Sequence, residues 1–411
     1  MSQHTVGGTG GRTSREEAER LDAADDLAGL RDEFQFEPSG PIYLDGHSLG
    51  RLPLAAKEAL ADFVDREWGV DLVRGWERWV DWPQRLGDRL GRTVLGAAEG
   101  QVVVCDSTTV NLYKAAASVV ASRPGALITE RGNFPTDRYV LQGLSRATGR
   151  ELRYVEVDFD SGIDLGRVAE AAAGAALVVL SFVDFRSGAL ASMQPINEAC
   201  HAEGALVCWD LSHAVGAVEV ELDRAGCDLA VGCTYKYLNA GPGSPAFIYV
   251  RRDLQAELRQ PIWGWFGQAE QFVMGPDYSP LNGIGQQLTG TPPVLGLASL
   301  EAALSVVEKP GMSALREKGT ALVEFGLLLA EEVTAGTAAR LAGPLRAPER
   351  GSHLTFRIPD AEKFGARLAA AGVLGDVRPP DLVRLGLSPA YTRFVDVWDA
   401  LHRVGELLHS A

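Results

Sequence analysis

A lysine in the middle of the chain has surroundings that make its charge costly. Lys236 lies between two tyrosines in CTYKYLNAGPGS, after the apolar run CDLAVG and before a turn rich in Gly and Pro. Desolvation would disfavour its ammonium form, and the neutral amine is the form that makes a Schiff base with a carbonyl group. Lysines that run along a core edge with the ammonium in water are commoner, so Lys236 alone leaves both possibilities open.

An acid and a histidine follow another apolar run. GALVCWD ends at Asp210, and His213 stands three residues later in LSHAVG. In open α/β sheets, ligands bind beyond the carboxyl ends of the strands, which would place both side chains at a binding site. The alternative is that Asp210 only caps a helix.

Two further strand ends carry residues suited to an anion and to an aromatic ring. QVVVCD is followed by Ser107, Thr108 and Thr109 at an expected helix start, where hydroxyls and free backbone N–H groups can bind an anion. ERGNFPTD places Phe134 before a proline turn and Asp137 after it. The structural alternatives are a plain capping cluster and a loop with a half-buried aromatic residue.

These residues together match the requirements of pyridoxal phosphate. The cofactor needs a phosphate cradle, a side chain that stacks on its ring, an acid that keeps its pyridine nitrogen protonated, and a lysine amine. The combination therefore predicts a pyridoxal phosphate site, although each residue alone has an ordinary explanation.

The elements that must position these residues alternate along the chain. From about residue 100 to 250, short apolar runs alternate with helix-like stretches such as STTVNLYKAAASVVAS and QPINEACHAE. Strands that alternate with helices predict an α/β fold with a mostly parallel central sheet covered on both faces. The strand candidates are QVVVCD, GALITE, ELRYVEVD, AALVVLSFV, GALVCWD, DLAVGC and AFIYV.

The pattern changes near residue 295, where a long helix and the strand candidates HLTFRI and LVRLGL follow. We expect a large domain over residues 51–295 and a smaller α+β domain formed by residues 21–50 and 296–411. Residues 1–20 are expected to be a flexible tail that leads into a helix capped near Ser14, with Glu17 in capping-box spacing.

Composition narrows the class of protein. The 411 residues carry a net charge of -15, which argues against binding to nucleic acid. No apolar run approaches the ~20 residues that span a bilayer, and the N-terminus has no secretory h-region. The five cysteines show no C-x-x-C spacing and indicate a reducing cytoplasm. No H-E-x-x-H motif is present, so a metal site has no support.

A series of short blocks resembles kynureninase, a family of fold-type-I pyridoxal phosphate enzymes in the class V aminotransferase group. The blocks run in the family's order from about residue 41 to 402, and the segment 210–239 is the most specific. Other class V relatives share the Asp-x-x-His and lysine theme without this full set. The blocks are YLDGHSLG, TTVNL, FPTDRY, WDLSHAVG, CTYKYLNAGPG, GWFG, GTPP and VRLGLSPAYTRFVDVWDAL.

The resemblance implies roles for the matching residues at the cofactor. Lys236 would link to pyridoxal phosphate and move protons between the substrate Cα and the cofactor. Asp210 would pair with the pyridinium nitrogen, with Asp137 and His213 close by. The other expected cofactor contacts are Phe134 on the ring, Thr108, Thr109 and Tyr235 at the phosphate, Ser181 nearby, and Trp265 and Thr291 from the partner subunit of a homodimer. Tyr235 could also take part in proton transfer.

The resemblance also implies a substrate and a reaction. The expected reaction is hydrolysis of L-kynurenine to anthranilate and L-alanine by Cβ–Cγ cleavage, in tryptophan catabolism. Arg384 would bind the α-carboxylate, a bidentate task that suits guanidinium, and Ser48 and Trp76 would line the aryl pocket. His47, beside that pocket, replaces the usual Asn and is a further candidate for substrate binding; a satisfied structural histidine is the alternative.

Further departures from the family's sequence pattern bear on the choice of substrate more than on the binding of the cofactor. Gln268 replaces the usual His after GWFG, and the segment after Trp76 is shorter than in the family. Trp76, in place of a histidine, favours an unhydroxylated ring, so kynurenine is expected over 3-hydroxykynurenine, and another substituted kynurenine stays open. The rival functions are a cysteine desulfurase-like lyase, which would need a mobile cysteine, and a non-catalytic module of the same fold.

Overall fold

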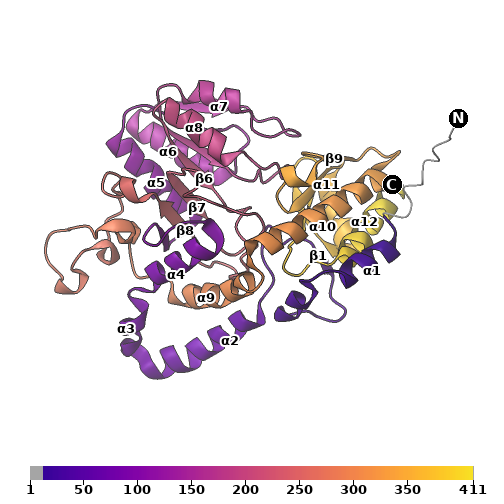
Figure 1. The fold of residues 1–411 in the computed structure, drawn as a ribbon, viewed down its shortest axis with the longest axis horizontal. Coiled ribbons are helices and arrows are strands. Elements are labelled where there is room, and N and C mark those ends of the chain that lie inside the picture. Colours follow the sequence, from indigo (N-terminus) through magenta and orange to yellow (C-terminus); the bar gives the residue numbers. More distant parts are fainter. Residues whose placement is uncertain (1–12, 411) are drawn as a thin grey trace.

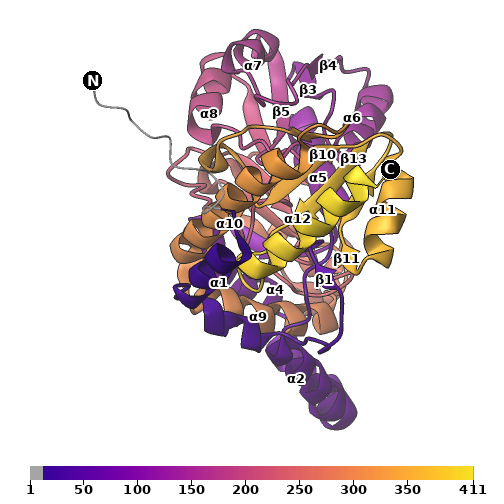
Figure 2. The same ribbon diagram turned by 90° about the vertical axis from the view of Figure 1, so that its right-hand side faces the viewer.

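The structure is a computed structural model that describes residues 13–410 (Figures 1 and 2). Its centre is a seven-stranded sheet in the order β2-β8-β7-β6-β5-β3-β4. All neighbouring pairs between β7 and β4 are parallel, whereas β8 is antiparallel to both of its neighbours. The strands are β2 (Val102–Val104), β3 (Ala126–Glu130), β4 (Leu152–Val155), β5 (Ala175–Ser181), β6 (Leu206–Asp210), β7 (Leu229–Gly232) and β8 (Phe247–Val250).

Alternate residues of these strands enter two separate apolar cores. In β2, Val103 belongs to one core, and Val102 and Val104 belong to the other, as the period-2 geometry of a strand requires. On the Val103 face lie α5 (Thr108–Ser122) and α6 (Pro135–Thr148). The opposite core includes residues of α4 (Trp82–Leu90), α7 (Leu165–Ala172), α8 (Met193–Ala202) and α9 (Val294–Glu308).

The sequence-based expectation of a mostly parallel sheet with helices on both faces is confirmed. Each of the seven apolar runs chosen between about residues 100 and 250 contains one strand of the central sheet. β5 shows why, because all of its residues from Ala175 to Ser181 are buried, and strands covered on both faces consist of nearly continuous apolar runs.

A second sheet lies beside the first (Figure 1). It is antiparallel, in the order β12-β13-β10-β9, and shares an apolar core with α10, α11 and α12. A two-stranded parallel pair, β1 with β11, adjoins it. The elements are β1 (Ile42–Tyr43), β9 (Arg340–Ala342), β10 (His353–Arg357), β11 (Val373–Leu374), β12 (Asp376–Arg378), β13 (Leu382–Gly386), α10 (Gly311–Thr334), α11 (Ala361–Ala370) and α12 (Phe394–His409).

Two structural features bear on the expected domain boundaries. The helix α1 (Arg15–Ala23) begins within the segment 1–20 that we expected to be a flexible tail, and Ser14 caps it by accepting a hydrogen bond from the Glu17 N–H, as the spacing predicts. Residues 1–12 lie outside the described part of the chain. At the other boundary, α9 packs into the core of the large sheet, so we propose that the large domain extends through α9 rather than ending at residue 295.

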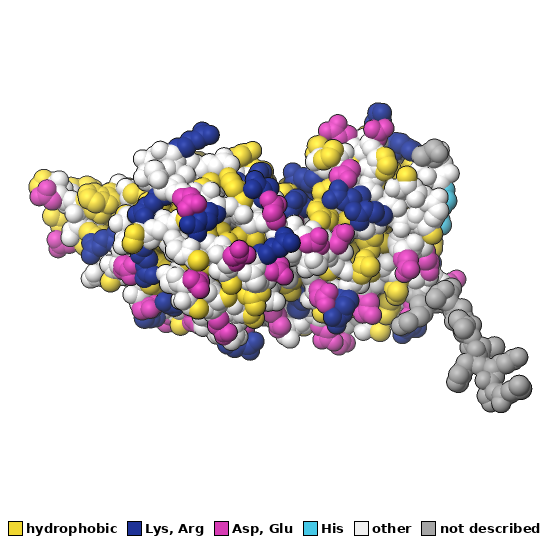
Figure 3. All heavy atoms as spheres, turned by 90° about the horizontal axis from the view of Figure 1, so that it is seen from above, with side chains coloured by type: hydrophobic (Ala, Val, Ile, Leu, Met, Phe, Trp, Pro, Cys, Tyr) yellow, Lys and Arg dark blue, Asp and Glu magenta, His cyan; other side chains and the backbone are white. Residues whose placement is uncertain are grey.

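On the face drawn in Figure 3, acidic and basic side chains are interspersed and form no continuous basic patch. Among the described residues, no helix is both long and apolar enough to cross a membrane.

Candidate active site

A cavity of about 200 Å³ opens beyond the carboxyl ends of the central strands. The sheet brings its walls together because β6 ends at Asp210, and β7 ends at Gly232, just before Lys236. α5 and α6 begin at the same edge of the sheet. The predicted site residues that line the cavity are Thr108, Thr109, Phe134, Asp137, Asp210, Tyr235 and Lys236.

The start of α5 forms the wall suited to an anion. Asp106 turns the chain from β2 into the helix with a left-handed backbone (φ 47°), and its carboxylate accepts a hydrogen bond from Lys114 Nζ at 2.7 Å. Ser107 caps the helix by accepting from Val110 N–H. First-turn N–H groups have no acceptor within their own helix, so those of Thr108 and Thr109, which precede the capped Val110 N–H, are available to a ligand beside their hydroxyls.

Two carboxyl groups, of Asp137 and Asp210, line the opposite part of the cavity. Asp210 Oδ1 accepts a hydrogen bond from Ser212 N–H at 2.7 Å. Asp137 is fully buried, and neither of its oxygens has a hydrogen-bond partner among residues 13–410. Burial, reinforced by the charge of Asp210, raises the pKa of Asp137 well above its usual value. Burial therefore favours the protonated form of Asp137 over its carboxylate form.

Lys236 lies at the centre of this arrangement and is 8% exposed. Its Nζ is 3.3 Å from Nε2 and 3.4 Å from Nδ1 of His213, and 5.7 Å from the ring centre of Phe134. Burial, together with the charge of Lys236, lowers the pKa of His213 well below its usual value. His213 is thus a neutral imidazole that faces an amine.

Ser181 and Phe134 are held by a residue that the sequence reasoning missed. Asn133 Oδ1 accepts hydrogen bonds from Phe134 N–H at 2.6 Å and from Ser181 Oγ at 2.7 Å. Asn133 therefore ties the backbone of Phe134, which lines the cavity, to the end of β5, whereas Ser181 does not itself line the cavity. The only sequence signal was the position of Asn133 directly before Phe134 and Pro135.

Arg384 and Ser48 meet at a second group of polar residues. Arg384, on β13, is fully buried and donates hydrogen bonds to the Phe185 carbonyl and to Asp376. Asp376 also accepts from Ser48 Oγ at 2.7 Å and from Arg378 at 2.8 Å. The sequence reasoning missed Asp376, which has no motif of its own and reaches Arg384 only because β12 and β13 pair at these two residues.

His47 is fully buried beside this group. Its ring stacks on His353 at a centroid distance of 5.2 Å, and neither ring nitrogen has a hydrogen-bond partner within residues 13–410. Burial and the charge of Arg384 lower the pKa of His47, while burial raises the pKa of Asp45, 3.5 Å from His47 Nδ1, to about 6. Asp45, His47 and Asp376 lie close enough to share a metal ion, but Asp376 already binds Arg378 and Arg384.

A close approach of backbones ties the segment of His47 and Ser48 to that of Lys236. Gly50 N–H donates to the Tyr235 carbonyl at 2.8 Å, and a Cβ at Gly50 would lie 2.2 Å from the Lys236 carbonyl oxygen. We expect Gly50→Ala to lower the free energy of unfolding by ~1–3 kcal/mol, because backbone atoms cannot yield as a side chain can.

The control for this prediction is Gly143→Ala. Gly143 lies within α6, and a Cβ added there would have no other atom within 4 Å, so alanine should stabilise the protein by roughly 0.5–1 kcal/mol. Urea unfolding of both variants measures the difference. Equal stability of the two variants would contradict the close approach at Gly50.

The remaining predicted residues lie away from the cavity. Trp76 packs against Trp79 and Phe266, with ring centres 5.3 and 6.1 Å apart. Trp265 is 38% exposed, and Thr291 is exposed. Gln268 binds its own loop, where its Oε1 accepts from Ser279 N–H at 2.6 Å.

Comparison with known proteins identifies the family to which this chain belongs. A family model described as "Kynureninase C-terminal domain" matches residues 315–404. The chain is 42% identical over 406 residues to a kynureninase from Pseudomonas fluorescens, with 96% of each chain covered. The chain belongs to the kynureninase family. A kynureninase from Burkholderia pseudomallei is 40% identical over 407 residues, which cover 96% of this chain and 95% of the relative.

Solved structures show that the kynureninase-family fold extends to other enzymes. A cysteine desulfurase from Escherichia coli superimposes with a TM-score of 0.81 at 17% identity, over 94% of this chain and 99% of the other. A C-DES variant with glycine covalently linked to its PLP cofactor gives a TM-score of 0.79 at 16% identity, over 92% and 99% of the two chains. At such identities the likeness concerns the fold alone.

The cysteines of this kynureninase-family chain do not suit desulfurase chemistry. All five are buried, and burial raises the pKa of each thiol. A nucleophilic cysteine needs access and a stabilised thiolate, and neither is present at these positions.

Proposed function

We propose that the chain is a pyridoxal-phosphate-dependent hydrolase that cleaves L-kynurenine to anthranilate and L-alanine. The observation that carries this proposal is that Lys236 and a pair of buried carboxyl groups line one cavity. The chain in which they do so is 42% identical to a kynureninase over nearly its whole length. The same residues argue against the non-catalytic alternative, since a chain without chemistry has no need of a buried amine beside buried acids.

The residues present fit the cofactor. When bound, pyridoxal phosphate supplies an aldehyde that links to an amine and a protonated ring that accepts electrons from the substrate. The carboxylate of Asp210 suits the ring nitrogen, and the start of α5 with Thr108 and Thr109 suits the phosphate. We assign Phe134 to the face of the cofactor ring and Lys236 to the cofactor aldehyde. Tyr235 is assigned to the cofactor phosphate, together with the two threonines.

Each side chain then has a share in the reaction. Lys236 takes the proton from the substrate Cα and returns it, and neutral His213 beside it adds no competing positive charge. Tyr235, whose pKa is raised by burial, stays a neutral hydroxyl that can donate a proton. Water adds to the γ-carbonyl and supplies the second oxygen of the anthranilate carboxyl group. The Cβ–Cγ bond breaks, and Cβ takes a proton to complete alanine.

Arg384 is the proposed partner of the substrate α-carboxylate. We expect Arg384→Gln to raise KM by roughly 10- to 100-fold, because a charge-assisted hydrogen bond contributes about 1.5–3 kcal/mol. Arg384→Lys should recover little, since an ammonium cannot serve the Phe185 carbonyl, Asp376 and a substrate with a planar fork of donors.

Steady-state kinetics with kynurenine measure this effect. Arg346→Gln is the matched control, because that arginine is exposed and its one ion pair within residues 13–410 is with Glu349 on the surface. A KM unchanged in Arg384→Gln would contradict the assignment.

We propose a homodimer to which the partner subunit brings Trp265 and Thr291. Exposed apolar side chains support this proposal, because such patches mark association surfaces. They lie in the segment after α2 (Leu54–Asp62) and on both sides of Trp265, and include Trp68, Val70, Val73, Trp263, Phe272, Val273 and Met274. Reduced, unpaired cysteines support a cytoplasmic location.

The test is a parallel assay of kynurenine and 3-hydroxykynurenine with the cofactor-loaded protein. Anthranilate fluorescence should appear with kynurenine, at a higher kcat/KM than is found for the hydroxylated substrate. A loaded protein that releases no anthranilate would refute the proposal. His47→Asn should shift the ratio of the two kcat/KM values and leave the visible cofactor absorbance unchanged, because His47 lies at the Arg384 end of the site.

A further inference from the structure

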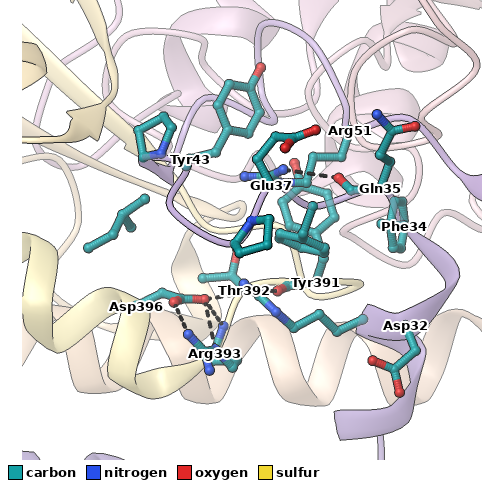
Figure 4. A pocket seen from close by; sticks show the side chains of 16 residues that line it. Asp32, Phe34, Gln35, Glu37, Tyr43, Arg51, Tyr391, Thr392, Arg393 and Asp396 are labelled. Carbon is teal, nitrogen blue, oxygen red and sulfur yellow. Dashed lines mark hydrogen bonds and ion pairs between the residues drawn. The ribbon is translucent and has the colours of Figure 1, made fainter.

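A second cavity lies between the N-terminal segment and the start of α12 (Figure 4). Its volume is about 670 Å³, within the range of about 300–1,000 Å³ typical of small-molecule sites. It shares no lining residue with the cavity at Lys236. The walls come from the segment between η2 (Ala28–Glu33) and β1, from Arg51, and from residues 391–396.

Arg51 is the unusual residue of this cavity. Its guanidinium is half-buried, its Nε has no hydrogen-bond partner, and its Nη1 makes only a long hydrogen bond of 3.3 Å to the Gln35 carbonyl. Within residues 13–410, no carboxylate lies at ion-pair distance from it. The neighbouring Arg31 and Arg393, in contrast, both pair with Asp396.

Aromatic rings hold the Arg51 guanidinium in place. Its Cζ lies 4.1 Å from the ring centre of Phe36 and 5.1 Å from that of Tyr43. Arg31 covers Phe36 at 3.8 Å. The rings orient the cation and offer apolar walls, but they provide no hydrogen-bond acceptor for its free N–H groups.

We propose that this cavity binds a small aromatic monocarboxylate, with its carboxylate on Arg51. Guanidinium matches a carboxylate with two parallel donors, and aromatic walls suit a ring in offset or edge contact. The exposed Glu37 at the cavity rim, labelled in Figure 4, and Asp32 add negative charge. This charge disfavours ligands with more than one negative charge, such as phosphate.

Isothermal titration of the cofactor-loaded protein with benzoate tests the proposal. We expect saturable binding that is roughly ten- to hundredfold weaker in Arg51→Gln, the loss typical of removing one charge-assisted partner. Arg384→Gln should keep this binding, which separates the cavity from the active site. Inorganic sulfate should bind more weakly than benzoate, and Glu37→Gln should reduce the difference in affinity between the two anions.

Further measurements ensure that a negative result has a clear meaning. Arg51→Gln should keep the visible cofactor absorbance and the kcat of the unaltered protein, and Arg51→Lys should retain part of the benzoate affinity. Benzoate binding that persists in Arg51→Gln, that disappears in Arg384→Gln, or that is absent from the unaltered protein would overturn the proposal. Anthranilate can be titrated in the same way, and only that arm rests on the proposed reaction.

Discussion

Replacing Lys236 by alanine is expected to abolish both the visible absorbance of the bound cofactor and the cleavage of kynurenine. Among residues 13–410, Lys236 is the only lysine that lines the cavity. It is also the basic group 3.3 Å from His213. Loss of a positioned proton carrier costs about 10²–10⁴-fold in rate, and loss of the covalent link to the cofactor adds to this cost. We therefore expect a decrease in kcat of at least ~10³-fold.

The measurement combines an absorbance spectrum of the purified protein with single-turnover fluorescence of anthranilate. Lys363→Ala is the control, because the side chain of that lysine is 81% exposed and, in the described part of the chain, forms an ion pair with Asp360 alone. A Lys236→Ala protein that keeps the absorbance band, or more than about a tenth of the wild-type rate, would show that another group performs the chemistry.

The two buried carboxyl groups should respond very differently to neutralisation. Asp210→Asn removes the charge that would hold the ring nitrogen protonated, and we expect kcat to fall by ~10²–10³-fold, the cost of losing one preorganised electrostatic partner. Asp137→Asn replaces a carboxyl group whose pKa is raised by burial and by the charge of Asp210, so the substitution removes less negative charge. Its effect should stay within about tenfold.

This comparison is matched because both substitutions are isosteric and both side chains line one cavity. Kinetics and the pH dependence of the cofactor absorbance would be measured for the two variants together. Equal losses would mean that the charge is shared between the acids, and a larger loss in Asp137→Asn would reverse our assignment.

The fold could be predicted because each strand of the central sheet is a separate apolar run. β5 and β6, for example, are buried over their whole length, so their burial on both faces is already visible in their composition. The antiparallel direction of β8 has no such signal, because the run FIYV looks the same in either direction.

The site residues that could be predicted from the sequence are those whose residue type, at the end of a strand, itself suggests a chemical role. Lys236, Asp210 and the threonines of α5 are of this kind. Asn133, Asp376 and His353 are different, because their significance depends on contacts made by distant segments. His353 meets His47 only after β10 pairs with β13 and Gly386 comes beside the segment of Asp45. Neither the spacing of these residues along the chain nor the sequence pattern around them predicts such a contact.

The division of the two polar groups between the two sheets has a practical consequence for engineering. Every lining residue around Lys236 belongs to the large sheet and its connections, whereas Arg384, Asp376 and His353 belong to the small one. A mutant library confined to β10, β12, β13 and residues 45–48 would therefore alter selectivity without touching the chemical machinery. The fold thus keeps recognition and reactivity on separable modules, which directed evolution can vary one at a time.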